Sequence, residues 1–272
     1  MSNHNSHRNQ NGIVIHTDAG DFAGMRKAGA LAAATLDFIT PYVTPDVTTE
    51  YLDNLCNQYI TEHGGTSACI GYHGYPKYTC ISINHEICHG IPSPERKLLN
   101  GEILNIDVTV IVDGWHGDTS RMYYAGKPSV KAKRLCEVTY ECLMRGIEAV
   151  KPGAHFGDIG AVIEEIAHHY GYSVVDMFCG HGLGKVFHDE PNVMHCGKKG
   201  TGPRIEEGMF FTIEPMINFG KKDATILAND WTAVTKDRSL SAQFEHSLAV
   251  TADGAEIFTL SPAGLTCPPY KL

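Results

Sequence analysis

The chain matches itself when it is shifted by 107 residues, and the shift is the same throughout, without a gap. It superposes Pro45 on Pro152 and Asp107 on Glu214, together with several glycines and apolar residues. Each copy predicts an opening turn at the proline, an amphipathic helix, a glycine stop and a later strand that carries one carboxylate. The identities are few, and common helix patterns could account for some of them, but the paired carboxylates favour a duplication. Such a repeat restricts the fold to two related halves that meet at the seam of a single domain.

The expected elements and boundaries follow from this repeat. Helices are expected over residues 48–62 and 156–169. A single domain is expected over residues 13–260, with halves at about 13–125 and 126–260. Residues 1–12 are polar and are expected to form a disordered tail, and residues 261–272 are expected to form a C-terminal tail.

Composition excludes several classes of function. The chain has 272 residues and a formal net charge of −9, whereas a protein whose main role is to bind nucleic acid is expected to be basic. No stretch is apolar for long enough to span a membrane, and the first residues lack the apolar centre of a signal peptide. The nine cysteines include no C-x-x-C pair, which favours reduced thiols in a cytoplasmic protein.

Two of the expected strands bury a carboxylate. Asp107 lies in the apolar run 103–112, and Glu214 lies in the apolar run 209–217. A lone buried carboxylate is costly or becomes protonated, and this cost is removed when several carboxylates share a divalent cation. These two acids therefore predict a metal site.

A β-hairpin would bring a third acid to the same place. Asp113-Gly114 is a common hairpin turn, and with the turn there Asp107 falls opposite Ser120. Asp118 precedes Ser120 by two residues and therefore shares its face of the strand. Taken alone, Asp118 would also fit a strand acid that faces solvent.

Two further residues complete the candidate ligand set. His181 is flanked by glycines, which suit a backbone brought close to a small ligand, although such a histidine is more often a turn residue. Glu245 lies in the strand-like run 241–250. Taken alone, it fits an acid on an edge strand about as well as it fits a metal ligand. Imidazole suits borderline divalent metals, and carboxylates suit harder ions such as Mn. Only the set predicts a two-metal site: Asp107, Asp118, His181, Glu214 and Glu245.

Six segments together resemble the methionine aminopeptidase family, in order and spacing, from about residue 13 to about residue 258. The short interval between His181 and Glu214 resembles the type I branch. No zinc-binding extension precedes the first segment, so the short bacterial form is expected. The segments are Cys88-His89-Gly90-Ile91-Pro92, Asn105-Ile106-Asp107, Gly117-Asp118-Thr119-Ser120, Gly180-His181-Gly182-Leu183-Gly184, Thr212-Ile213-Glu214-Pro215 and Gln243-Phe244-Glu245-His246.

The resemblance implies a fold and a metal centre. The fold would be the pita-bread α/β (α+β) fold, in which two pseudo-symmetric halves share a curved antiparallel sheet covered by helices. The cofactors would be two divalent metal ions, drawn from Co, Mn, Fe, Zn or Ni. Asp107 would chelate one ion, His181 and Glu214 would hold the other, and Asp118 and Glu245 would bridge the pair.

The resemblance also implies the catalytic and substrate contacts. Glu214 would take the proton of an activated water as general base, His188 would hydrogen-bond the scissile carbonyl, and His89 would contact the scissile nitrogen. An apolar pocket with soft walls would enclose the unbranched methionine side chain. Its expected residues are Cys69, Tyr72, Tyr75, Cys80, Phe187, Met216 and Trp231.

The implied activity is removal of the initiator methionine from nascent proteins, with a small second residue. The enzyme would be cytoplasmic and monomeric, would bind peptides with an N-terminal methionine, and would not bind a membrane or DNA. Transient contact with the ribosome would use the basic residues Lys198 and Lys199 or the segment 131–134. The alternatives are a proline-directed peptidase of the same fold, such as prolidase or aminopeptidase P, and a non-catalytic binding module on that fold. The filled ligand positions argue against the binding module.

Overall fold

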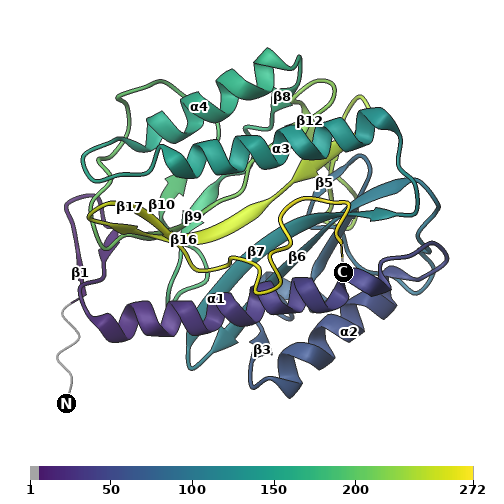
Figure 1. Cartoon of the computed structure of the whole chain (residues 1–272), viewed down its shortest axis with the longest axis horizontal. Helices are drawn as coiled ribbons and strands as arrows, with labels where there is room; N and C mark the ends of the chain where they lie inside the picture. Colours follow the sequence, from purple (N-terminus) through teal and green to yellow (C-terminus); the bar gives the residue numbers. More distant parts are fainter. Residues whose placement is uncertain (1–5, 272) are drawn as a thin grey trace.

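The computed structural model describes residues 6–271, so residues 1–5 and 272 lie outside the description. A nine-stranded antiparallel sheet forms the centre, with the strand order β10-β9-β11-β16-β7-β6-β3, and β17 and β4 pair with β16 and β6. The helices lie on the outside, with α3 and α4 beside one half of the sheet and α1 and α2 beside the other (Figure 1). The strands of this sheet are β3 (Thr66–Ser67), β4 (Cys80–Ile83), β6 (Glu102–Val112), β7 (Trp115–Ala125), β9 (Gly180–Gly182), β10 (Asp189–Val193), β11 (Phe210–Ile213), β16 (Glu245–Thr251) and β17 (Gly254–Ile257).

Two smaller sheets and one short hairpin surround the central sheet. The first small sheet has the order β15-β12-β8, the second has the order β13-β14-β5, and β1 pairs with β2. Their strands are β1 (His7–Arg8), β2 (Val14–Ile15), β5 (Glu86–Cys88), β8 (Ser173–Val174), β12 (Met216–Asn218), β13 (Ala224–Ile226), β14 (Ala233–Thr235) and β15 (Ser241–Gln243). Two 3₁₀ turns span Thr40–Tyr42 and Tyr72–Gly74.

The expected hairpin is confirmed as β6 and β7. Asp113 and Gly114 both have positive φ, at 51° and 82°, as the tight turn between right-twisted strands requires. Asp107 pairs with Ser120 across this hairpin, which is the expected register. The register matters for function because a slip of one residue would turn Asp107 and Asp118 to the other face of the sheet.

The two expected helices are also confirmed. α2 (Thr49–Glu62) begins after Thr48, whose side chain accepts a hydrogen bond from the backbone of Tyr51, and α4 spans Phe156–His169. Their ranges differ by the same 107 residues as the sequence repeat. α1 (Ala19–Ile39) and α3 (Val130–Glu148) were not predicted. α1 packs closely on β7. Only glycine fits at position 117, because a Cβ atom there would come within 2.3 Å of the α1 backbone.

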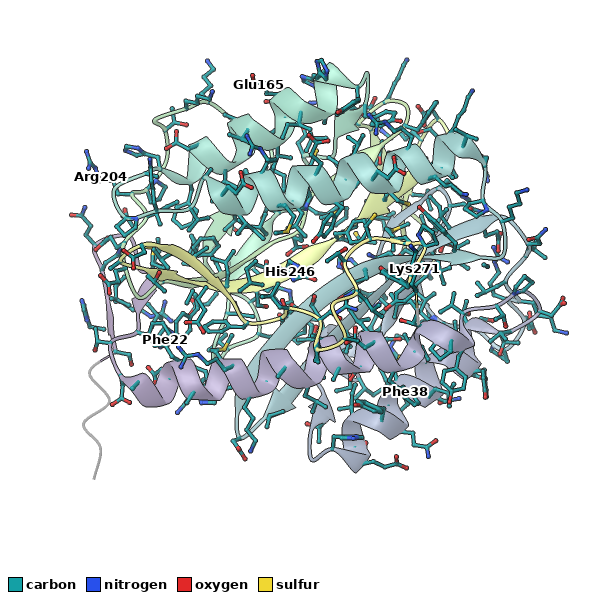
Figure 2. The ribbon with its side chains drawn as sticks, in the orientation of Figure 1. Phe22, Phe38, Glu165, Arg204, His246 and Lys271 are labelled. Atoms are coloured by element: carbon teal, nitrogen blue, oxygen red, sulfur yellow. The ribbon has the colours of Figure 1, made fainter. Side chains whose placement is uncertain are left out.

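Each pair of helices covers its own hydrophobic core. Leu135 and Phe211 belong to the core beside α3 and α4, whereas Leu36 and Leu104 belong to the core beside α1 and α2. Figure 2 shows Glu165 on the outer side of α4 and His246 in the interior, which agrees with their exposed and buried positions. Because the cores lie on the helix side, the opposite, concave side of the sheet is left for polar side chains.

The structure orders part of the predicted N-terminal tail. Residues 1–5 of the expected disordered tail lie outside the described residues, but His7–Arg8 pairs with Val14–Ile15, so the part from residue 6 to residue 12 is ordered. The Asn9 side chain stabilises the turn by accepting hydrogen bonds from the backbone of Asn11 and Ile13. At the other end, Tyr270 donates a hydrogen bond to the Met122 carbonyl, so the C-terminal tail packs on the sheet.

The run 209–217 is not one strand. It is divided into β11 and β12 at Glu214-Pro215, since proline has no N–H to donate to a sheet. In the part of the chain that the structure describes, no helix is both long and apolar enough to cross a membrane.

Candidate metal centre and active-site cavity

The central strands place three of the predicted acids next to one another. Asp107 on β6 pairs with Ser120 on β7, and Ser120 pairs in turn with Glu245 on β16. Asp118 lies two residues before Ser120 and so points to the same face. The Thr109 hydroxyl donates a hydrogen bond of 2.7 Å to Asp118 Oδ1. These three acids therefore come from three neighbouring strands.

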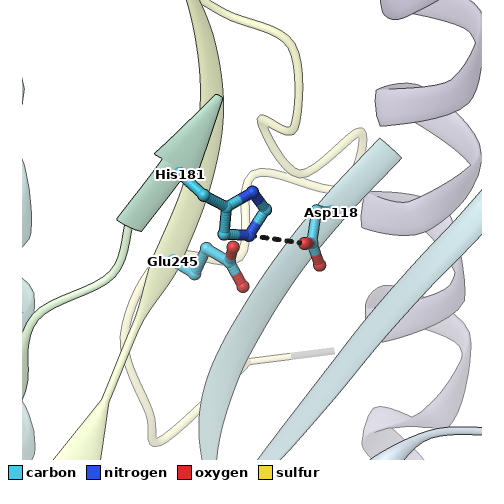
Figure 3. Close-up of side chains that lie close together, drawn as sticks. All are labelled: Asp118, His181 and Glu245. Atoms are coloured by element: carbon cyan, nitrogen blue, oxygen red, sulfur yellow. Dashed lines mark ion pairs between the residues drawn. The ribbon is translucent and has the colours of Figure 1, made fainter. Parts of the chain in front are cut away.

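His181 completes the cluster from β9. Its ring Nδ1 lies 3.1 Å from the Gly182 carbonyl oxygen and can donate to it, which leaves Nε2 facing the acids, where it would ligate a cation once deprotonated. Nε2 lies 3.5 Å from Asp118 Oδ2 and 3.6 Å from Glu214 Oε1. Figure 3 shows His181, Asp118 and Glu245 converging on one point.

The glycine beside His181 has a packing role. β10 lies so close that a Cβ atom at Gly182 would come within 2.0 Å of the Glu190 carbonyl oxygen. The sequence suggested that the glycines beside His181 allow a ligand to approach the backbone. In the structure, the glycine at position 182 is required because the neighbouring strand approaches so closely.

Glu214 lies at the break between β11 and β12, where it is held by three groups. The Thr212 hydroxyl donates a hydrogen bond of 2.8 Å to Oε1, and Gln243 Nε2 donates one of 3.2 Å to Oε2. The Glu214 backbone N–H donates to His195 Nε2 at 3.0 Å. Thr212 also accepts a hydrogen bond from the backbone of His181, so one hydroxyl positions both predicted ligands.

The cluster has the composition and spacing of a metal site. Ligand atoms of Asp118, His181 and Glu245 all lie within 4.8 Å of one another, and all three residues are buried. Asp107 Oδ1 is buried without a hydrogen-bond partner. Carboxylate oxygens and one imidazole nitrogen are suitable ligands for divalent first-row metals. A divalent cation would satisfy the unpartnered oxygen and neutralise the acids, so the residues fit the metal that the sequence predicted.

The electrostatics support the same conclusion. Burial raises the pKa of Asp107 and the pKa of Glu245 well above their usual range, and Asp118 raises both further. Burial also raises the pKa of Glu214 to about 7, although His181 opposes that shift. Burial lowers the pKa of His181, but its hydrogen bond to Asp118 and the charge of Glu214 outweigh burial, so its pKa is raised. Four acids that disfavour one another's charge provide a strong site for a cation.

A cavity of about 680 Å³ opens beside this cluster. All fourteen residues that the sequence singled out line it, although they are distributed from Cys69 to Glu245. The metal-ligand candidates form its floor, and the walls carry the catalytic and pocket candidates, which are Cys69, Tyr72, Tyr75, Cys80, His89, Phe187, His188, Met216 and Trp231.

The walls differ in polarity and rigidity. Tyr75 is buried, and its hydroxyl proton is shared between the Thr79 and Gly90 carbonyl oxygens. Its ring therefore presents an apolar surface and packs edge-on against Trp231, with 5.0 Å between the ring centroids. His188 lies at the mouth of the cavity, where its Nδ1 is 2.8 Å from the Tyr72 hydroxyl. The ring packs on Phe187.

Sequence reasoning missed several functional neighbours. Thr212 and Gln243 hold Glu214, Thr109 holds Asp118, and Phe178 packs edge-on against His89 with 5.5 Å between ring centroids. Thr212 and Gln243 each precede a predicted ligand by two residues in a strand-like run, so the same-face rule was a usable signal for both. Nothing in the sequence indicated Phe178.

Comparison with known proteins gives the family. The model of metallopeptidase family M24 matches residues 23–252. Methionine aminopeptidase from Rickettsia prowazekii (strain Madrid E) is 57% identical over 259 residues, which cover 95% of this chain and 99% of that protein. The chain belongs to the methionine aminopeptidases of metallopeptidase family M24. The resemblance stated from the sequence is thereby confirmed.

Solved structures confirm the fold of this methionine aminopeptidase family member. The crystal structure of methionine aminopeptidase from Rickettsia prowazekii superposes with a TM-score of 0.90 at 56% identity and covers 91% of this chain and 100% of that chain. Prolidase from Pyrococcus furiosus superposes with a TM-score of 0.71 at 21% identity and covers 89% of this chain and 64% of that one, so it shares the fold alone. The expected pita-bread fold is therefore correct.

Proposed function

We propose that this chain is a metal-dependent aminopeptidase that removes the N-terminal methionine from nascent proteins and prefers a small second residue. The observation that carries the proposal is the placement of an acid and imidazole cluster on the floor of a cavity with apolar, sulfur-containing walls. A charged floor suits hydrolysis, and soft walls suit a thioether.

In this proposal two divalent ions are held by the five ligand candidates. Asp107 would hold one ion, His181 and Glu214 would hold the other, and Asp118 and Glu245 would contribute to both. Divalent ions supply Lewis-acid activation of water and of the scissile carbonyl. Their identity, among Co, Mn, Fe, Zn and Ni, depends on availability in the cell as well as on this ligand set.

Glu214 is the proposed general base. Burial raises the pKa of Glu214 to about 7 in the metal-free protein. From its place beside the cavity, the ionised carboxylate would accept a proton from water and return it to the leaving amine. The hydrogen bonds from Thr212 and Gln243 hold both of its oxygens, so the carboxylate needs no reorganisation before it reacts.

His188 and His89 are the proposed substrate contacts. When the Tyr72 hydroxyl donates to His188 Nδ1, the neutral ring carries its proton on Nε2 and can donate it to the scissile carbonyl. Burial lowers the pKa of His188 to about 4, which keeps the ring neutral at physiological pH. Burial also lowers the pKa of His89, so a neutral ring meets the scissile nitrogen.

The proposed partners are peptides with an N-terminal methionine. A monomeric state, a cytoplasmic location and transient contact with the ribosome stay predictions. For the ribosome contact, Lys198 and Lys199 are exposed, and Lys199 Nζ lies 3.5 Å from Glu165 on α4.

The function is tested by comparing hydrolysis of Met-Ala-Ser and Ala-Pro peptides. We expect release of methionine from the first and no cleavage of the second, loss of activity with a chelator, and recovery when Mn or Co is added back, because the acid cluster needs a cation to act. Peptide products are measured by chromatography. Cleavage of Ala-Pro alone would identify a proline-directed peptidase, and binding without cleavage of either peptide would identify a binding module.

Replacing His188 with alanine should lower kcat by about 100-fold and leave KM nearly unchanged, because a donor to the developing oxyanion acts in the transition state. Elemental analysis should show the same metal content as the unchanged protein, since His188 lies outside the ligand set. His168→Ala, on the exposed side of α4, is the matched control. Loss of metal in His188→Ala would contradict the assigned role.

A further inference from the structure

The segment that carries His188 is anchored at both ends, and in between Tyr72 contacts the rings of Phe187 and His188. It joins β9 to β10, and Lys185, Val186 and His188 are exposed. At its start, the Gly184 carbonyl accepts a hydrogen bond of 2.8 Å from the backbone N–H of His116. At its end, Asp189 opens β10 and pairs with Gly182. Asp189 therefore fixes the backbone that directly follows His188, while Tyr72 contacts the His188 ring.

Arg8 holds Asp189 with two parallel hydrogen bonds. Arg8 Nη1 lies 3.0 Å from Asp189 Oδ1, and Nη2 lies 2.7 Å from Oδ2. The two residues are 181 positions apart in the sequence. A planar guanidinium that meets a carboxylate through both nitrogens fixes direction as well as distance. Asp189 Oδ1 also accepts a hydrogen bond from the Glu190 backbone, so the same carboxylate braces the start of β10.

Arg8 itself rests on an anchored hairpin. β1 pairs with β2 through His7 with Ile15 and Arg8 with Val14. Ile13 and Ile15 are buried in the core beside α3 and α4. Next in the chain, the backbone N–H of His16 donates a hydrogen bond of 2.8 Å to the Gly208 carbonyl. The hairpin is therefore fixed to the body of the molecule, and Arg8 transmits that rigidity to Asp189.

We propose that Arg8 is a positioning residue, which through Asp189 holds His188 in the orientation needed for the scissile carbonyl. This inference rests on the proposed function. Asp189 itself lines the catalytic cavity, so the Arg8 contact lies at its wall. The contact also keeps the Asp189 carboxylate paired, which prevents it from accepting hydrogen bonds from peptide groups that enter the cavity.

The pair is expected to affect turnover more than stability. The Arg8 and Asp189 side chains are 51% and 20% exposed, and exposed ion pairs contribute little to the free energy of unfolding. A small displacement of a group that contacts the reacting atoms, by contrast, lowers the rate of the chemical step strongly.

The test compares three variants on Met-Ala-Ser with the metal-loaded full chain. Arg8→Gln and Asp189→Asn each remove the paired charges, and Arg26→Gln is the matched control. Arg26 makes a similar two-pronged pair with Glu256 and is 54% exposed, but neither residue lines the cavity. We expect Arg8→Gln and Asp189→Asn to lower kcat by about 3- to 10-fold with KM, metal content and Tm nearly unchanged, whereas Arg26→Gln has no effect on kcat.

A second arm asks whether Arg8 acts through His188. In the His188→Ala background, Arg8→Gln should cause no further loss of kcat, because the group that Arg8 positions is already absent. Exchanging the charges in the double variant Arg8→Asp with Asp189→Arg should recover part of the lost kcat.

The outcomes separate this inference from the proposed function. If the unchanged chain does not release methionine, the proposed function fails. If it does and Arg8→Gln equals the unchanged chain in kcat, or the same fold-loss persists in the His188→Ala background, the positioning role of Arg8 is overturned.

Discussion

Replacing Glu214 with glutamine is expected to lower kcat for Met-Ala-Ser by about 1,000-fold, because removal of a general acid or base costs about 10²- to 10⁴-fold in rate. Glutamine has the same shape but cannot accept the proton of water. Methionine release and bound metal should be measured on the same sample. We expect weaker metal binding as well, since one charged ligand is lost.

The local hydrogen bonds make this substitution a clean test. Gln243 Nε2 now donates to Glu214, while Gln243 Oε1 is buried without a partner. A flip of the Gln243 amide would offer Oε1 to the new amide, so no donor would face another donor. The fold should therefore be retained. Glu207→Gln, an exposed change outside the cavity, is the control, and unchanged kinetics in Glu214→Gln would remove Glu214 from the mechanism.

The second large effect is the loss of stability that the buried acids of the metal-free protein cause as the pH rises. Burial raises the folded-state pKa of Glu214 from 4.5 to about 7, which corresponds to about 3 kcal/mol. Between these values the unfolded chain ionises and the folded chain does not, so stability is lost as the pH rises. Asp107 and Glu245, whose pKa burial raises well above the usual range, should extend the loss to higher pH. The buried His195 and His246, whose pKa burial lowers to about 3, and His188, whose pKa is lowered to about 4, act in the opposite direction, so the effect of the acids is measured against a variant. Between pH 5 and pH 8 the metal-free Tm of the unchanged chain should fall by about 5 to 10 °C relative to the metal-free Tm of Glu214→Gln.

Added metal should reverse this trend, because metal binding requires the ionised carboxylates and stabilises only the folded state. The measurement is thermal unfolding with and without Mn at both pH values. Glu245→Gln removes one of the acids, so its metal-free form should be more stable at pH 8 than the metal-free parent, while its gain from added metal should be smaller. The same change of metal-free Tm between the two pH values in the unchanged chain, in Glu214→Gln and in Glu245→Gln would contradict the electrostatic account.

Local patterns were sufficient for the elements that place the site. The alternation and turn chemistry around Asp113-Gly114 predicted both the hairpin and its register, since strand pairing at a tight turn is a short-range property. The helix over residues 48–62 was predicted from its amphipathic pattern between a proline turn and a glycine, which are also local features, and the structure adds that Thr48 caps its first turn. The predictions failed where contacts between distant parts of the chain determine whether a segment is ordered. Residues 1–12 were expected to be disordered because they are polar, yet His7 and Arg8 pair with β2, which is fixed by burial of Ile13 and Ile15 against another part of the chain.

The candidate site likewise has features that the sequence pattern predicted and features that only tertiary contacts determine. Five residues with charges or an imidazole in apolar or glycine-rich surroundings predicted a metal centre from the sequence alone, because a buried carboxylate must have a compensating partner. The sequence also determined the family and the repeat of two halves. Tertiary structure alone decided that Thr212 and Gln243 hold both oxygens of Glu214, that Asp107 Oδ1 has no protein partner, and that Arg8 reaches Asp189. These contacts join residues far apart in the chain or depend on side-chain direction, and neither property is encoded in local sequence pattern.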